Sequence, residues 1–181
     1  RMKSFYEWIR ANERWNVDDN QVFTGGQSMG GSGSIMFSIR NPDYAAWNAS
    51  WVGVHVPSMS PQFESSYRLV YGDQAYDVRV EDGTPVWDYY SDVWYLTNYP
   101  AKEIGYITFA NGKNDAAIGW EQAVRFYEAM QQTRRPHMFT WGQAGHGQRA
   151  NMPNSADNSV MPIAIRKNQS LPAFTRCQLD D

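Results

Sequence analysis

The sequence has few residues of the kinds that form disulfides or bind metal ions. Its 181 residues include a single cysteine, Cys177, which excludes an internal disulfide and a cysteine-based metal site. The three histidines, His55, His137 and His146, are too few to indicate a multi-histidine zinc site. We therefore expect no metal ion in this protein.

Long apolar runs and an excess of basic residues are absent as well. No stretch reaches the roughly 18 consecutive apolar residues of a membrane-spanning helix, so we expect no membrane partner. Lysine and arginine total 16 against 19 aspartates and glutamates, the net charge is −3, and the basic residues are scattered. This distribution lacks the basic patch of a nucleic-acid-binding protein, so we expect no nucleic-acid partner.

Apolar and aromatic residues, by contrast, are plentiful. Hydrophobic residues make up 42% of the chain, which is enough for one domain with a buried core and excludes a disordered chain. The chain has 8 tryptophans and 11 tyrosines. They allow two interpretations, ordinary packing or aromatic platforms for a sugar or aryl substrate.

A serine motif follows the short apolar stretch at 22–24. The run Gly26-Gln27-Ser28-Met29-Gly30 has the form G-x-S-x-G, which is typical of a tight strand-to-helix turn that presents a nucleophilic serine. The glycines matter because such a turn is crowded and its backbone is strained. The motif predicts Ser28 as the nucleophile of a serine hydrolase, and an ordinary glycine-rich turn is the alternative.

Strands and helices are expected to alternate along the chain, which indicates an α/β fold with a mostly parallel sheet flanked by helices. Apolar and β-branched runs predict strands at 21–24, 51–56, 104–110 and 137–141. The spacing of apolar residues predicts helices at 2–9, 29–39, 86–96 and 116–132. Residues 57–84, which are rich in Ser, Pro, Gly and Asp, are expected to cross the surface without regular structure.

An acid and a histidine follow the third and fourth predicted strands. Asp115 comes after the strand at 104–110, and His146 comes after the strand at 137–141. A serine nucleophile needs a histidine base, and the base needs an orienting carboxylate. We therefore predict Asp115 and His146 as the partners of Ser28.

Several alternatives stay open for the acid and the base. Asp115 could also cap a helix that begins near Ala116, a role compatible with catalysis. His55 could line the site although it precedes every candidate acid, and His137 is expected to be structural. The alternative acids are Asp73, Asp77, Asp82, Asp88 and Asp92.

In this combination the chain resembles the C-terminal half of an α/β-hydrolase-fold serine hydrolase, nearest to the esterase and prolyl-oligopeptidase-like branches. The matching pieces lie within residues 20–150 and are 26–31, 111–115, 120–132 and 145–147. The resemblance implies a triad of Ser28, Asp115 and His146. It also implies an oxyanion hole to which the backbone N–H of Met29 contributes.

The resemblance further implies that the N-terminal strands of the fold, with the second oxyanion donor, are missing, because 27 residues precede Ser28. An unpaired edge strand would result, and the missing N-terminal part of the same domain is the expected partner. Residues 1–150 are expected to form the C-terminal part of the catalytic domain. Residues 151–181 are expected to be an exit segment or linker.

The expected activity is hydrolysis of a carboxylic ester, in a small molecule or linked to a polymer, through an acyl-enzyme and without a cofactor. Gln27, Trp87 and Trp120 are predicted to contact the substrate. One alternative is a prolyl-oligopeptidase-like serine peptidase, and another is a non-catalytic binding module derived from the same fold. Because this branch often acts on external polymers, we expect a secreted or periplasmic protein.

Overall fold

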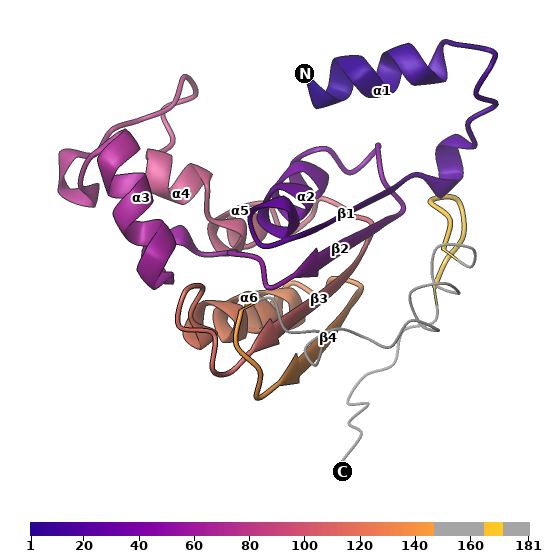
Figure 1. Ribbon diagram of the computed structural model, residues 1–181. Helices are drawn as coiled ribbons and strands as arrows, with labels where there is room; N and C mark the ends of the chain where they lie inside the picture. The colour runs from indigo at the N-terminus through magenta and orange to yellow at the C-terminus, as the bar shows by residue number, and fades with distance from the viewer. Residues whose placement is uncertain (147–164, 172–181) are drawn as a thin grey trace.

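A parallel sheet forms the centre of the chain (Figure 1). The computed structural model describes residues 1–146 and 165–171. Over these residues the sheet has the order β1-β2-β3-β4, with the strands Phe23–Gln27, Trp47–Trp51, Tyr106–Gly112 and His137–Gly142. Each neighbouring pair is parallel, which requires a crossover between successive strands. The α/β class predicted from the sequence is confirmed.

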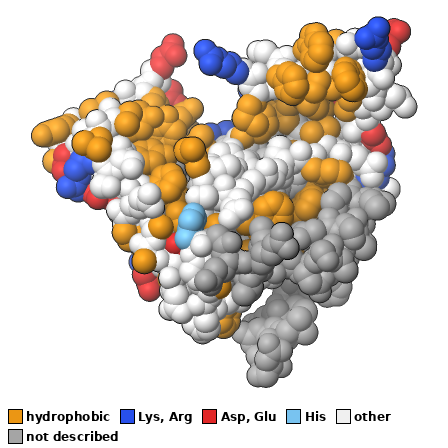
Figure 2. Space-filling model, viewed as in Figure 1, with side chains coloured by type: hydrophobic (Ala, Val, Ile, Leu, Met, Phe, Trp, Pro, Cys, Tyr) orange, Lys and Arg blue, Asp and Glu red, His pale blue; other side chains and the backbone are white. Residues whose placement is uncertain are grey.

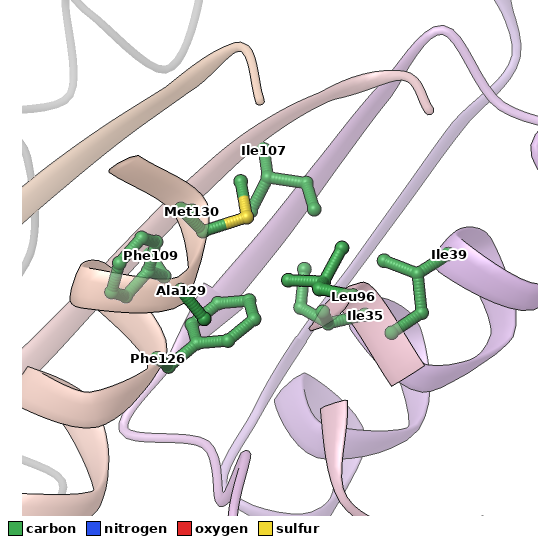
Figure 3. Packing of buried hydrophobic residues seen from close by; sticks show 8 residues of the cluster. All are labelled: Ile35, Ile39, Leu96, Ile107, Phe109, Phe126, Ala129 and Met130. Carbon is green, nitrogen blue, oxygen red and sulfur yellow. The ribbon is translucent and has the colours of Figure 1, made fainter. Parts of the chain in front are cut away.

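The crossover helices cover one face of this sheet. α2 (Met29–Arg40) connects β1 to β2, α5 (Asp92–Asn98) precedes β3, and α6 (Trp120–Gln132) connects β3 to β4. Right-handed crossovers that advance in one direction across a sheet place their helices on the same side. Figure 3 shows apolar side chains of these helices meeting those of β3. The buried members of this cluster are Ile35, Ile39, Leu96, Ile107, Phe109, Phe126, Ala129 and Met130.

Polar side chains fill part of the layer between α2 and the first two strands. The Thr24 hydroxyl donates to Asn48 Oδ1 at 2.7 Å, and the Ser34 hydroxyl donates to Thr24 Oγ1 at 2.7 Å. Ser38 also donates to Asn48 Oδ1. Buried polar groups are tolerated where they are hydrogen-bonded. These hydrogen bonds therefore allow β2, whose sequence is partly polar, to be buried.

The second strand lies earlier in the chain than the sequence predicts. The prediction of a strand at 51–56 is wrong, because β2 ends at Trp51 and Val52 has a φ of 47° that no strand residue adopts. The alternating valines of this stretch are buried in a loop instead. The true strand contains Asn48 and Ser50, whose burial depends on partners from other elements.

The segment between β2 and β3 is helical, so the prediction of an irregular stretch at 57–84 is wrong. It contains α3 (Pro61–Tyr71), α4 (Val86–Tyr89) and two short 3-10 helices, Pro57–Met59 and Gln74–Tyr76. The predicted helix at 86–96 is also divided, into α4 and α5. Ser91 begins α5 by accepting a hydrogen bond from the backbone N–H of Trp94 at 3.2 Å.

α1 (Met2–Arg10) begins the chain as predicted, but its apolar side chains are largely exposed. Met2, Phe5 and Trp8 are 56%, 62% and 56% exposed. The helix is held by Tyr6, whose hydroxyl donates at 2.9 Å to Oδ1 of Asp19, the first residue of the 3-10 helix Asp19–Gln21. Figure 2 shows hydrophobic side chains gathered over α1, and a second group over α3 and α4.

Part of the predicted exit segment packs against the sheet. Ile165 is 5% exposed and packs against Trp47 and Ala49, and Arg166 forms an ion pair with Asp18 at 2.6 Å. Residues 147–164 and 172–181 lie outside the described residues, so a boundary at residue 150 stays a prediction.

Among the helices that the structure describes, none combines the length and the apolar character needed to cross a membrane.

We expect His137, the first residue of β4, to make the stability of the chain depend on pH. Burial lowers the pKa of His137 below its ordinary value of 6.5, although its Nδ1–H donates to the carbonyl of Arg135 at 2.7 Å. Below that value the unfolded chain takes up a proton that the folded chain resists, so this histidine lowers stability as the pH falls. We expect His137→Gln to lose less stability than the parent between about pH 7.5 and about pH 5.5. Urea denaturation at both values measures this, and an identical loss in the two proteins would contradict it.

Candidate active site

The predicted turn around Ser28 is a strand-to-helix elbow. β1 ends at Gln27, α2 begins at Met29, and Ser28 between them has φ 54° and ψ −122°. A positive φ is strained for a residue with a side chain, so its neighbours must hold it. The Ser28 N–H donates to the carbonyl of Trp51 at 2.8 Å, and the Ser28 carbonyl accepts from the N–H of Ser32 at 3.0 Å.

The elbow requires glycine at positions 26 and 31, because a side chain at either position would clash with neighbouring atoms. A Cβ on Gly26 would lie 2.4 Å from the carbonyl carbon of Gly30, and a Cβ on Gly31 would lie 2.7 Å from Ser50 Oγ. A Cβ on Gly30 would meet nothing within 4 Å. Position 30 therefore contributes the backbone against which Gly26 packs and has room for a side chain, and the second crowded position is Gly31.

Ser28, Asp115 and His146 come together at the carboxyl edge of the sheet. His146 Nε2 lies 2.9 Å from Ser28 Oγ, and His146 Nδ1 lies 2.7 Å from Asp115 Oδ2. A carboxylate only accepts hydrogen bonds, so Nδ1 carries the proton of the neutral ring. Nε2 is then free to accept from the Ser28 hydroxyl, as a general base must. Gly147, the last residue of the predicted Gly-His-Gly motif, lies outside the described residues.

Asp115 is fixed by backbone contacts as well as by the histidine. Its side chain is 1% exposed, and its Oδ1 accepts from the N–H groups of Ala117 and Ile118, each at 3.1 Å. Asp115 therefore does cap backbone N–H groups, as predicted, but these groups belong to the turn before α6 and not to the helix itself. The helix begins at Trp120, with Gly119 at its N-cap, so the prediction of a helix from Ala116 is wrong. Because both oxygens of the Asp115 carboxylate accept hydrogen bonds, its orientation is fixed.

Met29 lies at the start of α2, beside the nucleophile. The N–H groups of the first turn of a helix have no partner within the helix, and they carry the positive end of its dipole. The N–H of Met29 is therefore suited to donate to an oxyanion formed at Ser28. The Met29 side chain is 72% exposed and lies at the surface.

The residues predicted to contact substrate lie in different surroundings. Gln27 is exposed at the end of β1, next to Ser28. Trp87 is 8% exposed, and its indole N–H donates to the carbonyl of Gly72 at 3.3 Å within the helical insertion. Trp120 is half-buried at the start of α6 and stacks on Phe139 with 5.8 Å between ring centroids. The structure gives Trp87 a packing role, and contact with substrate stays a prediction for all three.

The other two histidines are held away from this arrangement. His55 is fully buried, and its Nδ1 donates to Asp92 Oδ2 at 3.0 Å, so one of the alternative acids is already paired with a different histidine. His137 begins β4, at the opposite end of the strand from the loop that carries His146. Its ring accepts from the Gln131 side chain at 3.1 Å.

One feature beside Asp115 was missed by the sequence reasoning. The Lys113 ammonium lies 4.1 Å from the ring centroid of Trp141, which is 55% exposed, and 5.7 Å from that of Trp120. Lys113 follows β3 and Trp141 lies near the end of β4, so strand register brings them together. Only correct strand pairing could have revealed this contact, because the residues are far apart in the sequence.

Among residues 1–146 and 165–171, no group of three or more His, Cys, Asp or Glu side chains could hold a metal ion.

Comparison with known proteins identifies the fold. No protein-family model matches the chain, and no curated protein matches it in sequence. Solved structures do match: the S-formylglutathione hydrolase of Agrobacterium tumefaciens has a TM-score of 0.60, with 19% identity over 80% of this chain. The acylaminoacyl peptidase of Pyrococcus horikoshii has a TM-score of 0.63, with 15% identity over 83% of this chain. A puromycin-hydrolyzing peptidase of Mycobacterium tuberculosis has a TM-score of 0.59, with 17% identity over 78%.

These likenesses show that the chain has part of the α/β-hydrolase fold, and this prediction is confirmed. The chain covers 48% of the S-formylglutathione hydrolase, 23% of the acylaminoacyl peptidase and 21% of the puromycin-hydrolyzing peptidase. It therefore spans about half the length, or less, of these three proteins.

The two adjacent glycines of α2 provide a matched pair of substitutions. Gly31→Ala would press on Ser50 and on the Gly26 carbonyl, so we expect it to destabilise the chain by about 1–3 kcal/mol. Gly30→Ala meets open space and reduces the entropy of the unfolded chain, so it should be neutral or stabilising by up to about 1 kcal/mol. Urea denaturation of the two variants checks this, and equal destabilisation would contradict the packing described for the elbow.

Proposed function

We propose that this chain carries the catalytic residues of a serine hydrolase that cleaves a carboxylic ester through an acyl-enzyme. The observation that supports it most is the hydrogen-bond chain from Ser28 Oγ through His146 to Asp115, with distances of 2.9 and 2.7 Å. A nucleophile, a base and an orienting carboxylate within such reach are what an acyl-transfer serine requires. The fold also supports it, because similar structures include hydrolases and peptidases.

In the proposed reaction, Ser28 Oγ attacks the ester carbonyl carbon while His146 Nε2 takes the hydroxyl proton. The tetrahedral intermediate then breaks its bond to the leaving-group oxygen, which receives that proton from His146. Water attacks the acyl-enzyme with His146 again as base, the bond from the acyl carbon to Ser28 Oγ breaks as that oxygen takes the proton from His146, and the acid is released. Asp115 keeps the Nδ1 proton in place and stabilises the imidazolium, and the Met29 N–H donates to the oxyanion. Loss of one such donor lowers turnover by about 10²–10³.

The aromatic surface beside Asp115 supports an ester linked to a sugar or aryl group. Trp141 is more than half exposed and Trp120 is half-buried, and indole rings offer flat apolar faces to such groups. We therefore propose an acylated polysaccharide as the polymeric substrate. We also propose that the protein is secreted, because such polymers lie outside the cell. A peptidase is the second candidate, favoured by the likeness to the acylaminoacyl peptidase.

We also propose that another segment of the same catalytic domain pairs with the free edge of β1. Among residues 1–146 and 165–171, β1 is the first strand in the sheet order and pairs with β2 alone. An unpaired edge presents a row of N–H and C=O groups that favours pairing. That segment would also bring the second oxyanion donor. A non-catalytic binding module is the alternative if this part of the site is never completed.

Hydrolysis of matched substrates tests the proposed activity and its ester preference. We expect a p-nitrophenyl acyl ester to be cleaved faster than an aminoacyl-proline p-nitroanilide, and Ser28→Ala to remove the activity. Ser65→Ala, on the exposed surface of α3, is the control and should be unchanged. A preference for the proline amide would overturn the ester proposal. Absence of both activities in a protein that also contains the N-terminal strands would overturn the enzyme proposal.

Asp115→Asn tests the role of the carboxylate without changing its size. The Asn oxygen would stay on the N–H groups of Ala117 and Ile118, so its NH₂ would face His146 Nδ1. That arrangement forces the proton onto Nε2, which then cannot accept from Ser28. We expect kcat for the ester to fall by about 10³–10⁴.

The matched control for this variant is Asp82→Asn, in the exposed loop before α4. Steady-state kinetics should show no change for Asp82→Asn. A loss of similar size in both variants, or a small loss in Asp115→Asn, would contradict the assigned role.

A further inference from the structure

We propose that Ser32 and His55 are positioning residues that hold the elbow of Ser28 against the buried loop at 52–56. This inference rests on the proposed nucleophilic role of Ser28. Neither residue reaches the reacting atoms in the structure, so each would act through the backbone that carries the nucleophile. His55 was expected only as a possible lining residue, and Ser32 is not part of the serine motif.

Ser32 connects the elbow to the loop directly. Its hydroxyl donates to the carbonyl of Ser28 at 3.2 Å and accepts from the N–H of Val54 at 2.7 Å. The Ser28 N–H is bound on the other side, to the carbonyl of Trp51 at 2.8 Å. One peptide group that flanks the strained φ and ψ of Ser28 is therefore tied to the last residue of β2, and the other is tied through Ser32 to the loop at 52–56.

That segment is itself fixed by side chains from the other core elements. The Gly53 carbonyl accepts from the amides of Asn111 and Gln122, each at 3.2 Å. The N–H of His55 donates to Gln122 Oε1 at 2.7 Å, and its carbonyl accepts from the N–H of Asp92 at 2.8 Å. The loop thus joins β3, α5 and α6, although it has no regular structure.

The contacts of the His55 ring fix the position of this loop. It is fully buried, stacks on Phe126 with 4.1 Å between centroids, and donates from Nδ1 to Asp92 Oδ2 at 3.0 Å. Nε2 then accepts from the hydroxyl of Ser50 at 3.4 Å. Arg40 pairs with the other oxygen of Asp92 at 3.1 Å, so the buried carboxylate has a charged partner. Turning the ring would leave buried polar groups unpaired, which is costly.

A small shift of the elbow is enough to matter. Ser28 Oγ must stay within hydrogen-bond distance of His146 Nε2, and a misplacement of about 1 Å in a reacting group lowers rates by about 10²-fold. Without the Ser32 hydroxyl, the strained backbone of Ser28 loses one of the contacts that oppose its relaxation. We therefore expect removal of the Ser32 hydroxyl to lower the rate at which Ser28 reacts by more than the accompanying loss of folding stability would explain.

The test compares substitutions of serines on the same helix. Ser32→Ala should lower the second-order rate of labelling by a fluorophosphonate about tenfold, and Ser32→Thr, which keeps a hydroxyl, should restore most of it. The pH midpoint of labelling should not move, because His146 and Asp115 are untouched. Ser38→Ala, which removes a buried hydroxyl bonded to Asn48, is the control and should lower Tm without lowering the labelling rate.

His55→Gln extends the test through a double-mutant cycle with Ser32→Ala. If both act through the loop, the combined loss in labelling rate should be smaller than the product of the single losses. Independent, multiplicative losses would overturn the link between the two residues. Should His55→Gln fail to fold, the comparison of Ser32→Ala, Ser32→Thr and Ser38→Ala still decides the role of Ser32.

The outcomes also separate this inference from the proposed function. A protein that also contains the N-terminal strands of the fold and still takes no label at Ser28 would overturn the nucleophilic role of Ser28. A protein that labels at the same rate with and without the Ser32 hydroxyl would overturn only the positioning role.

Discussion

The structure depends on the strained backbone of Ser28, which turns the chain from β1 into α2 at the carboxyl edge of the sheet. A positive φ at a residue with a side chain persists only where the surroundings hold it. Here the parallel pairing of β1 with β2 places the Trp51 carbonyl against the Ser28 N–H. The same parallel order brings the loops after β3 and β4 to this edge, so Asp115 and His146 reach Ser28 from different strands.

Two arrays of serine, histidine and aspartate occur in the described residues, and burial separates their roles. In one, the His146 side chain is a third exposed and lies within hydrogen-bond distance of Ser28 Oγ. In the other, His55 and its partner Asp92 are closed inside the core, where no substrate can enter. The buried array supports the loop on which the exposed one rests. We therefore propose that the same three residue types serve positioning inside the molecule and proton transfer at its surface.

The sequence predicts most elements that are amphipathic or β-branched, and it fails where burial depends on partners from elsewhere. The elbow, β3, β4 and the order of Ser28, Asp115 and His146 follow from local patterns. β2 does not, because Asn48 and Ser50 are buried only through hydroxyl and imidazole partners that other elements supply. The Lys113–Trp141 contact and the loop at 52–56 likewise require knowledge of strand register and tertiary packing.

The measurement that tests the account most directly is mass spectrometry of the peptide modified by a fluorophosphonate, on this chain and on a protein that also contains the N-terminal strands of the fold. We expect an adduct on Ser28 that is lost in His146→Ala, because an unactivated serine hydroxyl is a weak nucleophile. An adduct confined to the longer protein would agree with a site completed by those strands. No adduct on Ser28 in either protein, or one that persists without His146, would contradict the central claim.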